Sequence, residues 1–320
     1  MDASIPESMN AAVIDRYGGP EVLHLEALSV PEPKRNEVLI RVEAAGIGVW
    51  DPYVRSGQLK MREHQFPEII GNDGAGTVVA IGTGVSRFQP GDRVYAFTEA
   101  GGFYAEYVTV DEDNVAFIPR GMDPGMAAAL GADGITALRG LEDQLRLHPY
   151  ETLMIFGASG GIGHLAVQLA KRKRARVVAV ASGSDGVELV RRLGADLALD
   201  GRCDDVAGRI RAFVPAGLDA ALVLAGGSAL DEALTTIKKG GRLAYPNGVE
   251  PVPRAPDGVD ARSYDADPNR EIFERLNDLI EPGPFHVELA RVYRLEQAEE
   301  AHREIGKHHL GKLTFHIGYS

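Results

Sequence analysis

A glycine-rich stretch in the middle of the chain constrains the fold more than any other feature. The apolar run at residues 153–156 has the length and composition of a strand buried on both faces. It leads into Gly-Ala-Ser-Gly-Gly-Ile-Gly at residues 157–163, and apolar residues then recur at helical spacing as far as Ala170. A strand, a glycine turn and a helix in this order predict one β-α unit of a parallel sheet.

The spacing Ala-x-Gly-x-x-Gly in this turn is a variant of the dinucleotide-binding fingerprint, with alanine in first place. The first small residue permits the tight turn, Gly160 lets a pyrophosphate approach the backbone, and Gly163 lets the helix pack closely on the strand. The helix N-terminus then directs unpaired N–H groups at the phosphates. A glycine-rich connection without a ligand is the alternative that the motif alone leaves open. The candidate dinucleotide contacts are Ala158, Ser159, Gly160, Gly161, Ile162 and Gly163.

Length and composition narrow the class of protein. A chain of 320 residues is long for a single core, so we expect two domains. The net charge of -12 argues against a nucleic-acid partner. Cys203 is the only cysteine, which excludes an intrachain disulfide and a cysteine-based zinc site. We see neither the pattern of a secretory signal nor an apolar run of membrane-spanning length, and therefore expect a cytoplasmic protein without membrane contact.

The pattern of the chain changes near Asp123. Before it, short strands separated by Gly and Pro predict a compact β-rich module. From Asp123 onward a helical pattern and then an alternation of strands and helices, up to residue 245, predict a parallel, doubly wound sheet. In the tail we expect helices over residues 270–280 and 293–304 and a last strand over 313–317, packed back on the first module. The strands expected before Asp123 include residues 37–43, 74–82, 91–97 and 103–110.

The order of these motifs resembles the medium-chain dehydrogenase/reductase superfamily, and within it the zinc-independent quinone oxidoreductase branch. The resemblance spans nearly the whole chain. It implies an α/β protein with a GroES-like β-rich catalytic domain (residues 1–124 and 267–320) and a Rossmann doubly wound parallel-sheet domain for NADP (residues 125–266). Relatives are commonly dimers, which implies a homodimer joined through an edge strand at residues 258–264. The segments that carry the resemblance are 51–57, 67–76, 88–94, 102–107 and the glycine turn.

The resemblance also predicts that no metal is bound. Zinc-dependent relatives carry a cysteine shortly before the position of Asp51 and a histidine-glutamate pair further on, where this chain has Gly48, Asn72 and Asp73. A catalytic zinc needs about three protein ligands. We interpret the tail histidines as solvated surface residues. Without a Lewis acid, quinones and conjugated enones are easier hydride acceptors than simple ketones. The tail histidines are His302, His308 and His309.

The residues after the second expected strand of the sheet favour NADPH over NADH. NAD-binding proteins place an acidic residue about twenty residues past the glycine turn, where this chain has Ala181 followed by Ser182. No carboxylate there repels a 2′-phosphate, and Ser182 can donate a hydrogen bond to it. Relatives often place a basic residue at the position of Gly186. Here Arg202 or Arg191 could supply the charge, although Arg191 is read more simply as an exposed helix residue.

Further cofactor contacts follow from the resemblance. Thr136 matches a threonine on the phosphate side, and Lys312, in the closing Gly-Lys pair, is expected to reach the cofactor. A surface lysine after a turn is the equal alternative for Lys312. The remaining expected contacts follow the fourth and fifth strands, the latter near the nicotinamide: Ala225, Gly226, Asn247 and Gly248.

Two residues are the candidates for catalysis. Tyr53 matches a cleft tyrosine of quinone reductases and could donate a proton or a hydrogen bond to the acceptor, unless it only packs. Asp51 matches an aspartate of the same motif, for which we expect a mostly structural role. Relatives have polar residues at the positions of Gly48 and Leu59, so the pocket, bordered by residues 58–67, should be unusually apolar.

The predicted function is hydride transfer from NADPH to a quinone or conjugated enone without zinc. A non-catalytic NADPH-binding sensor or scaffold of the same fold is the alternative. A short-chain dehydrogenase is excluded because no tyrosine has a lysine four residues later.

Overall fold

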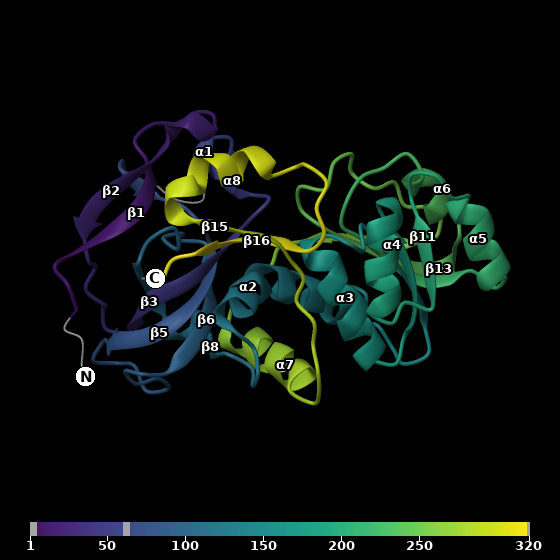
Figure 1. The fold of residues 1–320 in the computed structure, drawn as a ribbon. Coiled ribbons are helices and arrows are strands. Elements are labelled where there is room, and N and C mark those ends of the chain that lie inside the picture. The colour runs from purple at the N-terminus through teal and green to yellow at the C-terminus, as the bar shows by residue number, and fades with distance from the viewer. Residues whose placement is uncertain (1–4, 60–64, 319–320) are drawn as a thin grey trace.

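The computed structural model of the protein describes residues 5–59 and 65–318 (Figure 1). Within them the chain forms two sheets rich in antiparallel pairs and one parallel sheet. The antiparallel sheets hold the N-terminal third and the end of the chain, and the parallel sheet holds the middle. In Figure 1 the purple, blue and yellow elements therefore lie together, while the teal and green elements on the right of the view form the other part of the molecule.

The β-rich part contains a three-stranded sheet in the order β2-β1-β4 and a seven-stranded sheet in the order β15-β16-β3-β5-β6-β8, with β7 also paired to β3. The strand predicted over residues 103–110 begins only at Tyr107, because the preceding residues bond to loops and to β1; Tyr104 O, for example, accepts from Ala12 N. The elements are β1 (Ser8–Ile14), β2 (Leu23–Ser29), β3 (Glu37–Ile47), α1 (Asp51–Arg55), β4 (Glu68–Ile69), β5 (Asp73–Ile81), β6 (Arg93–Phe97), β7 (Tyr107–Asp111) and β8 (Val115–Phe117).

The middle of the chain forms a six-stranded sheet in the order β11-β10-β9-β12-β13-β14, in which every pairing is parallel. Separate apolar clusters cover its two faces, which confirms a doubly wound sheet. The strand order reverses at β9, and ligands of such sheets bind at the carboxyl end of the strands at this point. The strands are β9 (Thr152–Phe156), β10 (Arg176–Ala181), β11 (Leu197–Asp200), β12 (Leu218–Val223), β13 (Ile237–Pro246) and β14 (Asp260–Tyr264).

Helices pack on both faces of this sheet. The residue before α2 is Asp123, whose carboxylate accepts from Met126 N, so the predicted N-cap forms. The residue before α7 is Asn269, which caps that helix in the same way through Ile272 N. The helices are α2 (Pro124–Arg139), α3 (Gly161–Arg172), α4 (Gly183–Arg192), α5 (Val206–Phe213), α6 (Leu230–Leu234) and α7 (Arg270–Ile280).

The tail returns to the β-rich part as expected. The last strand, β16 (Lys312–His316), pairs antiparallel with β3, and β15 (Leu289–Arg294) pairs parallel with β16. The helix predicted over residues 293–304 is too long at its start, because Tyr293 and Arg294 end β15 and α8 covers only Ala298–Glu304. Figure 1 shows α8 lying beside α1 and the purple strands.

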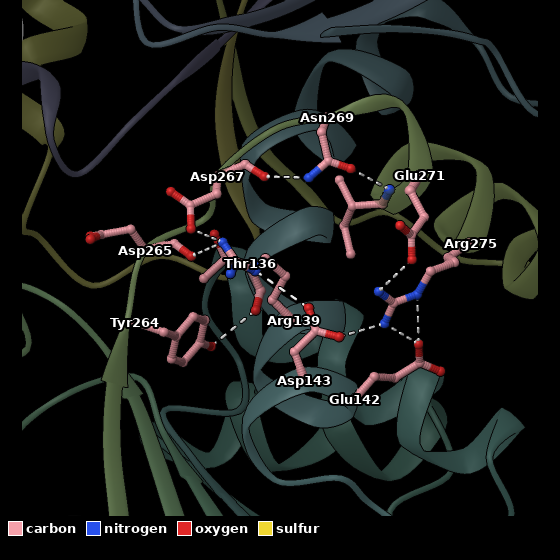
Figure 2. Close-up of polar contacts among 11 residues, drawn as sticks. Thr136, Arg139, Glu142, Asp143, Tyr264, Asp265, Asp267, Asn269, Glu271 and Arg275 are labelled. Carbon is pink, nitrogen blue, oxygen red and sulfur yellow. Dashed lines mark hydrogen bonds and ion pairs between the residues drawn. The ribbon is translucent and has the colours of Figure 1, made fainter. Parts of the chain in front are cut away.

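Side-chain contacts fasten the end of β14 and the helix α7 to α2 and the turn that follows it (Figure 2). The hydroxyl of Tyr264 donates to Thr136 O over 2.9 Å. The guanidinium of Arg275 donates to the carboxylates of Glu142 and Asp143 at 2.6 and 2.7 Å. These contacts join the helix that borders both parts to the strand at the edge of the parallel sheet. In the part of the chain that is described, no helix is long and apolar enough to cross a membrane.

Candidate active site

A cavity of ≈ 360 Å³ lies between the β-rich part and the parallel sheet. Residues 48–51 and 72–73 and Lys312 line it from the β-rich side. Residues 132–133, Thr136 and Ile162 line it from α2 and α3, and Pro246 and Asn247 from the end of β13. A second hollow, of ≈ 540 Å³, lies beside β7 and is lined by none of the predicted site residues. The smaller cavity therefore brings both halves of the predicted site together.

The glycine turn at this cavity has the shape that its sequence predicts. Gly157 has a φ of +85°, a conformation that side chains other than glycine rarely adopt. A Cβ at Gly163 would lie 2.2 Å from Gly157 O, so the close packing of α3 on β9 requires glycine there. A Cβ at Gly160 would meet only that same oxygen, at 3.7 Å. This open face beside the start of α3, with its unpaired N–H groups, fits a pyrophosphate.

Lys312 is buried at the floor of the cavity, so the alternative that makes it a surface lysine is wrong. Its ammonium pairs with Asp133 Oδ1 at 2.9 Å and Asp73 Oδ2 at 3.4 Å. Burial alone would lower the pKa of Lys312, but the two carboxylates raise it above its usual value. Asp133 also lies against the start of α3, where a Cβ at Gly161 would be 2.2 Å from its Oδ2. The lysine therefore ties β16, β5 and α2 together beside the glycine turn.

Two basic side chains and two carboxylates surround Gly183, at the start of α4. Asp185 Oδ1 would lie 2.7 Å from a Cβ there, and Gly183 N donates to Asp200 Oδ1 at 3.1 Å. A Cβ at this glycine would lie 3.7 Å from both Arg202 Nη1 and His308 Nε2. His308 Nε2 also lies 3.0 Å from a carboxylate oxygen of Asp185, and Ser182 is the residue before the helix. The sequence named Arg202 as a possible source of positive charge, which stays a prediction. It assigned His308 to the solvated surface, and the His308 side chain is exposed.

The residues that follow β12 and β13 divide into two groups. Asn247 lines the cavity and donates to Asp265 Oδ2 at 2.9 Å. Ala225 packs against Gly157 and so supports the turn from behind, whereas Gly226 lies against the backbone of Glu250, where a Cβ would be 2.4 Å from its O. Gly248 lies against the Trp50 ring, and a Cβ at this glycine would be 2.1 Å from a ring carbon.

Tyr53 and Gly248 line a separate hollow of ≈ 320 Å³ beside the cavity. The Tyr53 side chain is 45% exposed, and its ring lies 5.8 Å from that of Trp50, which lines both spaces. The structure thus does not bring Tyr53 to the same cavity as Thr136 and Asn247. Of the segment expected to border the pocket, Leu59 does line the cavity, whereas residues 60–64 lie outside the described residues.

Asp51 is a buried carboxyl group at the cavity wall. Its Oδ2 accepts hydrogen bonds from Gly48 N at 2.7 Å and from the Tyr104 hydroxyl at 2.5 Å. Burial, aided by the nearby charge of Asp73, raises the pKa of Asp51 to about 6 in spite of both bonds and of the Lys312 charge. The sequence predicted a mainly structural role for Asp51. The raised pKa of its carboxyl group was not foreseen from the sequence.

The bonds continue behind Asp51 through His302. Its Nε2 lies 3.2 Å from the Tyr104 hydroxyl, and its Nδ1 lies 2.7 Å from Arg55 Nη1. His302 is buried, so its interpretation as a solvated residue is wrong: the return of α8 to the β-rich part covers it. Burial and the charge of Arg55 lower the pKa of His302 to about 3, which keeps the ring neutral.

The positions at which zinc-dependent relatives carry ligands all line the cavity. Gly48 donates its N–H to Asp51, Asn72 donates its amide to Thr98 O at 2.8 Å, and Asp73 pairs with Lys312. Among residues 5–59 and 65–318, no three His, Cys, Asp or Glu side chains come together so as to hold a metal ion.

A β-rich domain joined to a Rossmann sheet, with a glycine turn at the cavity between them, defines the class of two-domain nucleotide-dependent oxidoreductases. Residues 34–120 match the family model of the alcohol dehydrogenase GroES-like domain, and residues 161–250 match that of zinc-binding dehydrogenases. The chain is 31% identical to the quinone oxidoreductase of Sus scrofa over 309 residues, 93% of this chain and 94% of that one. The protein belongs to the medium-chain dehydrogenase/reductase superfamily, in which it is quinone oxidoreductase-like.

Two other similar proteins agree with this assignment. The chloroplastic NADPH-dependent alkenal/one oxidoreductase of Arabidopsis thaliana is 34% identical over 292 residues, 88% of this chain and 72% of that one. The structure of the quinone oxidoreductase from Coxiella burnetii superposes with a TM-score of 0.83 at 26% identity, over 97% of this chain and all of that one. The fold, a GroES-like domain plus a Rossmann parallel-sheet domain, is therefore confirmed, and the chain is an oxidoreductase of this superfamily.

Proposed function

We propose that the protein is a zinc-independent reductase that uses NADPH to reduce quinones or conjugated enones. The observation that carries the proposal is the cavity that Ile162 of the glycine turn, Thr136 and Asn247 share with a wall of both apolar and charged side chains. Trp50 and Leu59 belong to that wall, which suits a flat conjugated acceptor. The names of the quinone and alkenal/one oxidoreductases among the similar proteins support the same acceptor classes.

The residues present fit NADPH. The backbone of residues 161–163 offers N–H groups to the pyrophosphate, and Thr136 and Asn247 border the space for the nicotinamide. Arg202 and His308 converge beside Gly183, where they would bind the 2′-phosphate with Ser182. Bound NADPH supplies the hydride; the chain orients the two reactants and keeps water away.

The arrangement around Lys312 supports chemistry without zinc. A fixed ammonium group already pairs with Asp73, the one carboxylate among the three positions at which zinc-dependent relatives carry ligands. We also propose the domain limits given by the resemblance, residues 1–124 with 267–320 and residues 125–266. We propose a homodimer joined at β14, which is the last strand of its sheet in the described part of the chain.

The test measures binding and oxidation of NADPH and NADH, with a quinone and an enone as acceptors. We expect turnover with NADPH. Arg202→Ala and His308→Ala should each weaken NADPH binding about tenfold or more, as expected for a charged hydrogen bond of about 1.5–3 kcal/mol. NADH binding should not change. Arg191→Ala is the matched control, because Arg191 is exposed and pairs only with Glu188 among described residues.

Three outcomes would count against the proposal. Tight NADPH binding without turnover of any acceptor would favour the non-catalytic sensor. A wild-type preference for NADH, or equal losses for both nucleotides in the Arg202 and His308 variants, would refute the assignment of the 2′-phosphate site.

A further inference from the structure

The reduction of a conjugated enone needs a proton as well as a hydride. Hydride addition at the β-carbon breaks the C=C π bond and leaves an electron pair on the resulting enolate. The α-carbon then has to form a bond to a proton before a saturated ketone can leave. If the protein reduces enones as proposed, one group of this chain has to hold that proton.

We propose that Asp51 is the proton donor and that the proton is held on its Oδ1. Asp51 is the buried carboxyl of the cavity wall that has no cationic partner within hydrogen-bond distance among the described residues. Both hydrogen bonds that it receives end on Oδ2. The oxygen that remains to carry a proton is therefore Oδ1.

The other ionisable groups of the cavity are less suitable donors. Lys312 is held charged between two carboxylates. Asp73 accepts from Ala132 N and Lys312 through Oδ2, while its Oδ1 lies against the backbone of Gly46, 2.3 Å from the position of a Cβ. Asp133 is paired with the same lysine at the start of α3. Tyr53 lines the neighbouring hollow instead.

The chain of bonds behind Asp51 fixes its orientation. Arg55 can only donate, so His302 Nδ1 accepts from it and Nε2 carries the ring hydrogen. This N–H then donates to the Tyr104 oxygen, and the Tyr104 O–H has to donate to Asp51. All three groups are buried and none lines the cavity. They act as positioning residues that fix the Asp51 carboxyl and keep Oδ2 as the acceptor.

The charges around Asp51 suit an acid that works near neutral pH. Burial and Asp73 favour the neutral carboxyl, whereas the bonds from Tyr104 and Gly48 and the charge of Lys312 favour the carboxylate. Arg55 adds a second positive charge behind Tyr104. The opposing effects leave the pKa of Asp51 at about 6, and a general acid is most effective when its pKa lies close to the working pH.

The proton step balances without another reactant. The Asp51 O–H bond breaks as the α-carbon forms its C–H bond, and the carboxylate that results takes up a proton from solvent after the product has left. A quinone does not need this donor to the same extent. The hydroquinone anion formed by hydride addition is a much weaker base than an enolate, and it can take its proton from bulk water after release.

The test compares Asp51→Asn with the wild type on one enone and one quinone. Asparagine keeps an oxygen that accepts from Gly48 and Tyr104 but has no acidic proton. We expect kcat for the enone to fall about a hundredfold, within the usual range for a general acid, and kcat for the quinone to fall less than threefold. In the wild type, enone kcat/KM should decline as the pH rises above about 6, and in the variant this dependence should disappear.

A second measurement needs neither cofactor nor turnover. Infrared difference spectra of the free enzyme should show a protonated carboxyl band that disappears as the pH rises through about 6 and that is missing from Asp51→Asn. Tyr104→Phe removes a bond that favours the carboxylate, so the band should persist to higher pH. Tyr95→Phe, a buried tyrosine that instead bonds to Asn277, is the matched control and should leave the band unchanged.

Equal losses on both acceptors in Asp51→Asn, or an infrared band that does not shift in Tyr104→Phe, would refute the Asp51 donor alone. A wild type that reduces neither acceptor would refute the proposed function together with this role.

Discussion

The two sides of the cavity are held by different means. On the side of the parallel sheet, the backbone and small residues set the shape: α3 approaches β9 because Gly163 has no Cβ, and Ala225 supports Gly157 from behind. On the β-rich side, buried polar groups set it: Asp51 through Tyr104, and Asp73 through Lys312. The first side makes room for a ligand by omitting side chains, and the second fills its wall with charges that have to stay paired.

Because the two walls are built differently, substitutions in them should affect the stability of the protein in different ways. A wall built from close backbone contacts should tolerate changes of charge and suffer from added volume. A wall built from buried ion pairs and hydrogen bonds should tolerate isosteric changes and suffer when one partner is lost.

Removal of the buried ammonium group should have the largest effect. Lys312→Met leaves the carboxylates of Asp73 and Asp133 without their cation, and breaking a buried pair from one side typically costs about 3–5 kcal/mol. Urea unfolding should show this loss in the free energy of unfolding. Lys307→Met is the control: its exposed ammonium pairs with Glu304, and the expected loss is below about 1 kcal/mol. Similar losses for both lysines would mean that the β-rich wall does not depend on buried charge.

The same difference explains what the sequence could predict. The glycine turn is local, because the strand, the fingerprint and the helix follow one another within about twenty residues, so its spacing was sufficient to place it. The parallel sheet followed from the alternation of strands and helices. Thr136 and Asn247, which the resemblance named as cofactor contacts, both line the cavity, and their contact with a cofactor stays a prediction.

The polar wall on the β-rich side could not be predicted from local sequence patterns, because the residues that pair in it are far apart in the chain. Arg55 and His302 are separated by 247 positions, and Asp73 and Lys312 by 239. Nothing next to His302 in the sequence indicates burial; it lies in a charged helix that is covered only when the tail returns. For the same reason, the sequence did not show that Trp50 separates Tyr53 from the cavity.

Two glycine substitutions test whether close backbone contacts shape the side of the cavity formed by the parallel sheet. In Gly163→Ala the added methyl meets Gly157 O, and overpacking of this kind costs about 1–3 kcal/mol in the free energy of unfolding. In Gly160→Ala the methyl finds open space, so stability should be kept while NADPH affinity falls about tenfold, or about 1.4 kcal/mol. Thermal unfolding and fluorescence titration measure the two effects. The control is Gly283→Ala, at a position without neighbours within 4 Å. If Gly160→Ala loses stability instead of affinity, the open face of the turn is not the cofactor site.

One buried histidine lies on each side of the cavity, so the two sides can also be compared through the pH dependence of stability. His302 has a folded-state pKa of about 3, so below pH 6.5 the unfolded chain takes up a proton there that the folded protein does not. This contribution to stability is therefore lost as the pH falls, by about 2 kcal/mol at pH 5. His302→Gln, whose amide can keep both bonds, should flatten the pH dependence of urea unfolding between pH 7 and about 5. Burial also lowers the pKa of His164, beside the glycine turn, but the bond to Gly160 O and then the charges of Asp133 and Glu288 oppose this effect, so we expect a smaller contribution. A larger effect in His164→Gln would reverse the comparison.

The smallest effect is expected for a hydrogen bond on the side of the parallel sheet. Tyr264→Phe removes the bond to Thr136 O, but this carbonyl still accepts from Gly140 N, so no buried acceptor is left unsatisfied. The loss in the free energy of unfolding should then be about 1 kcal/mol. Tyr150→Phe, at a side chain that is 77% exposed, is the control and should have no measurable effect. Urea unfolding at two pH values tests the point further, since a wall held by packing should show the same loss at both. A loss as large as that of Lys312→Met would mean that single polar contacts hold this side of the cavity as well.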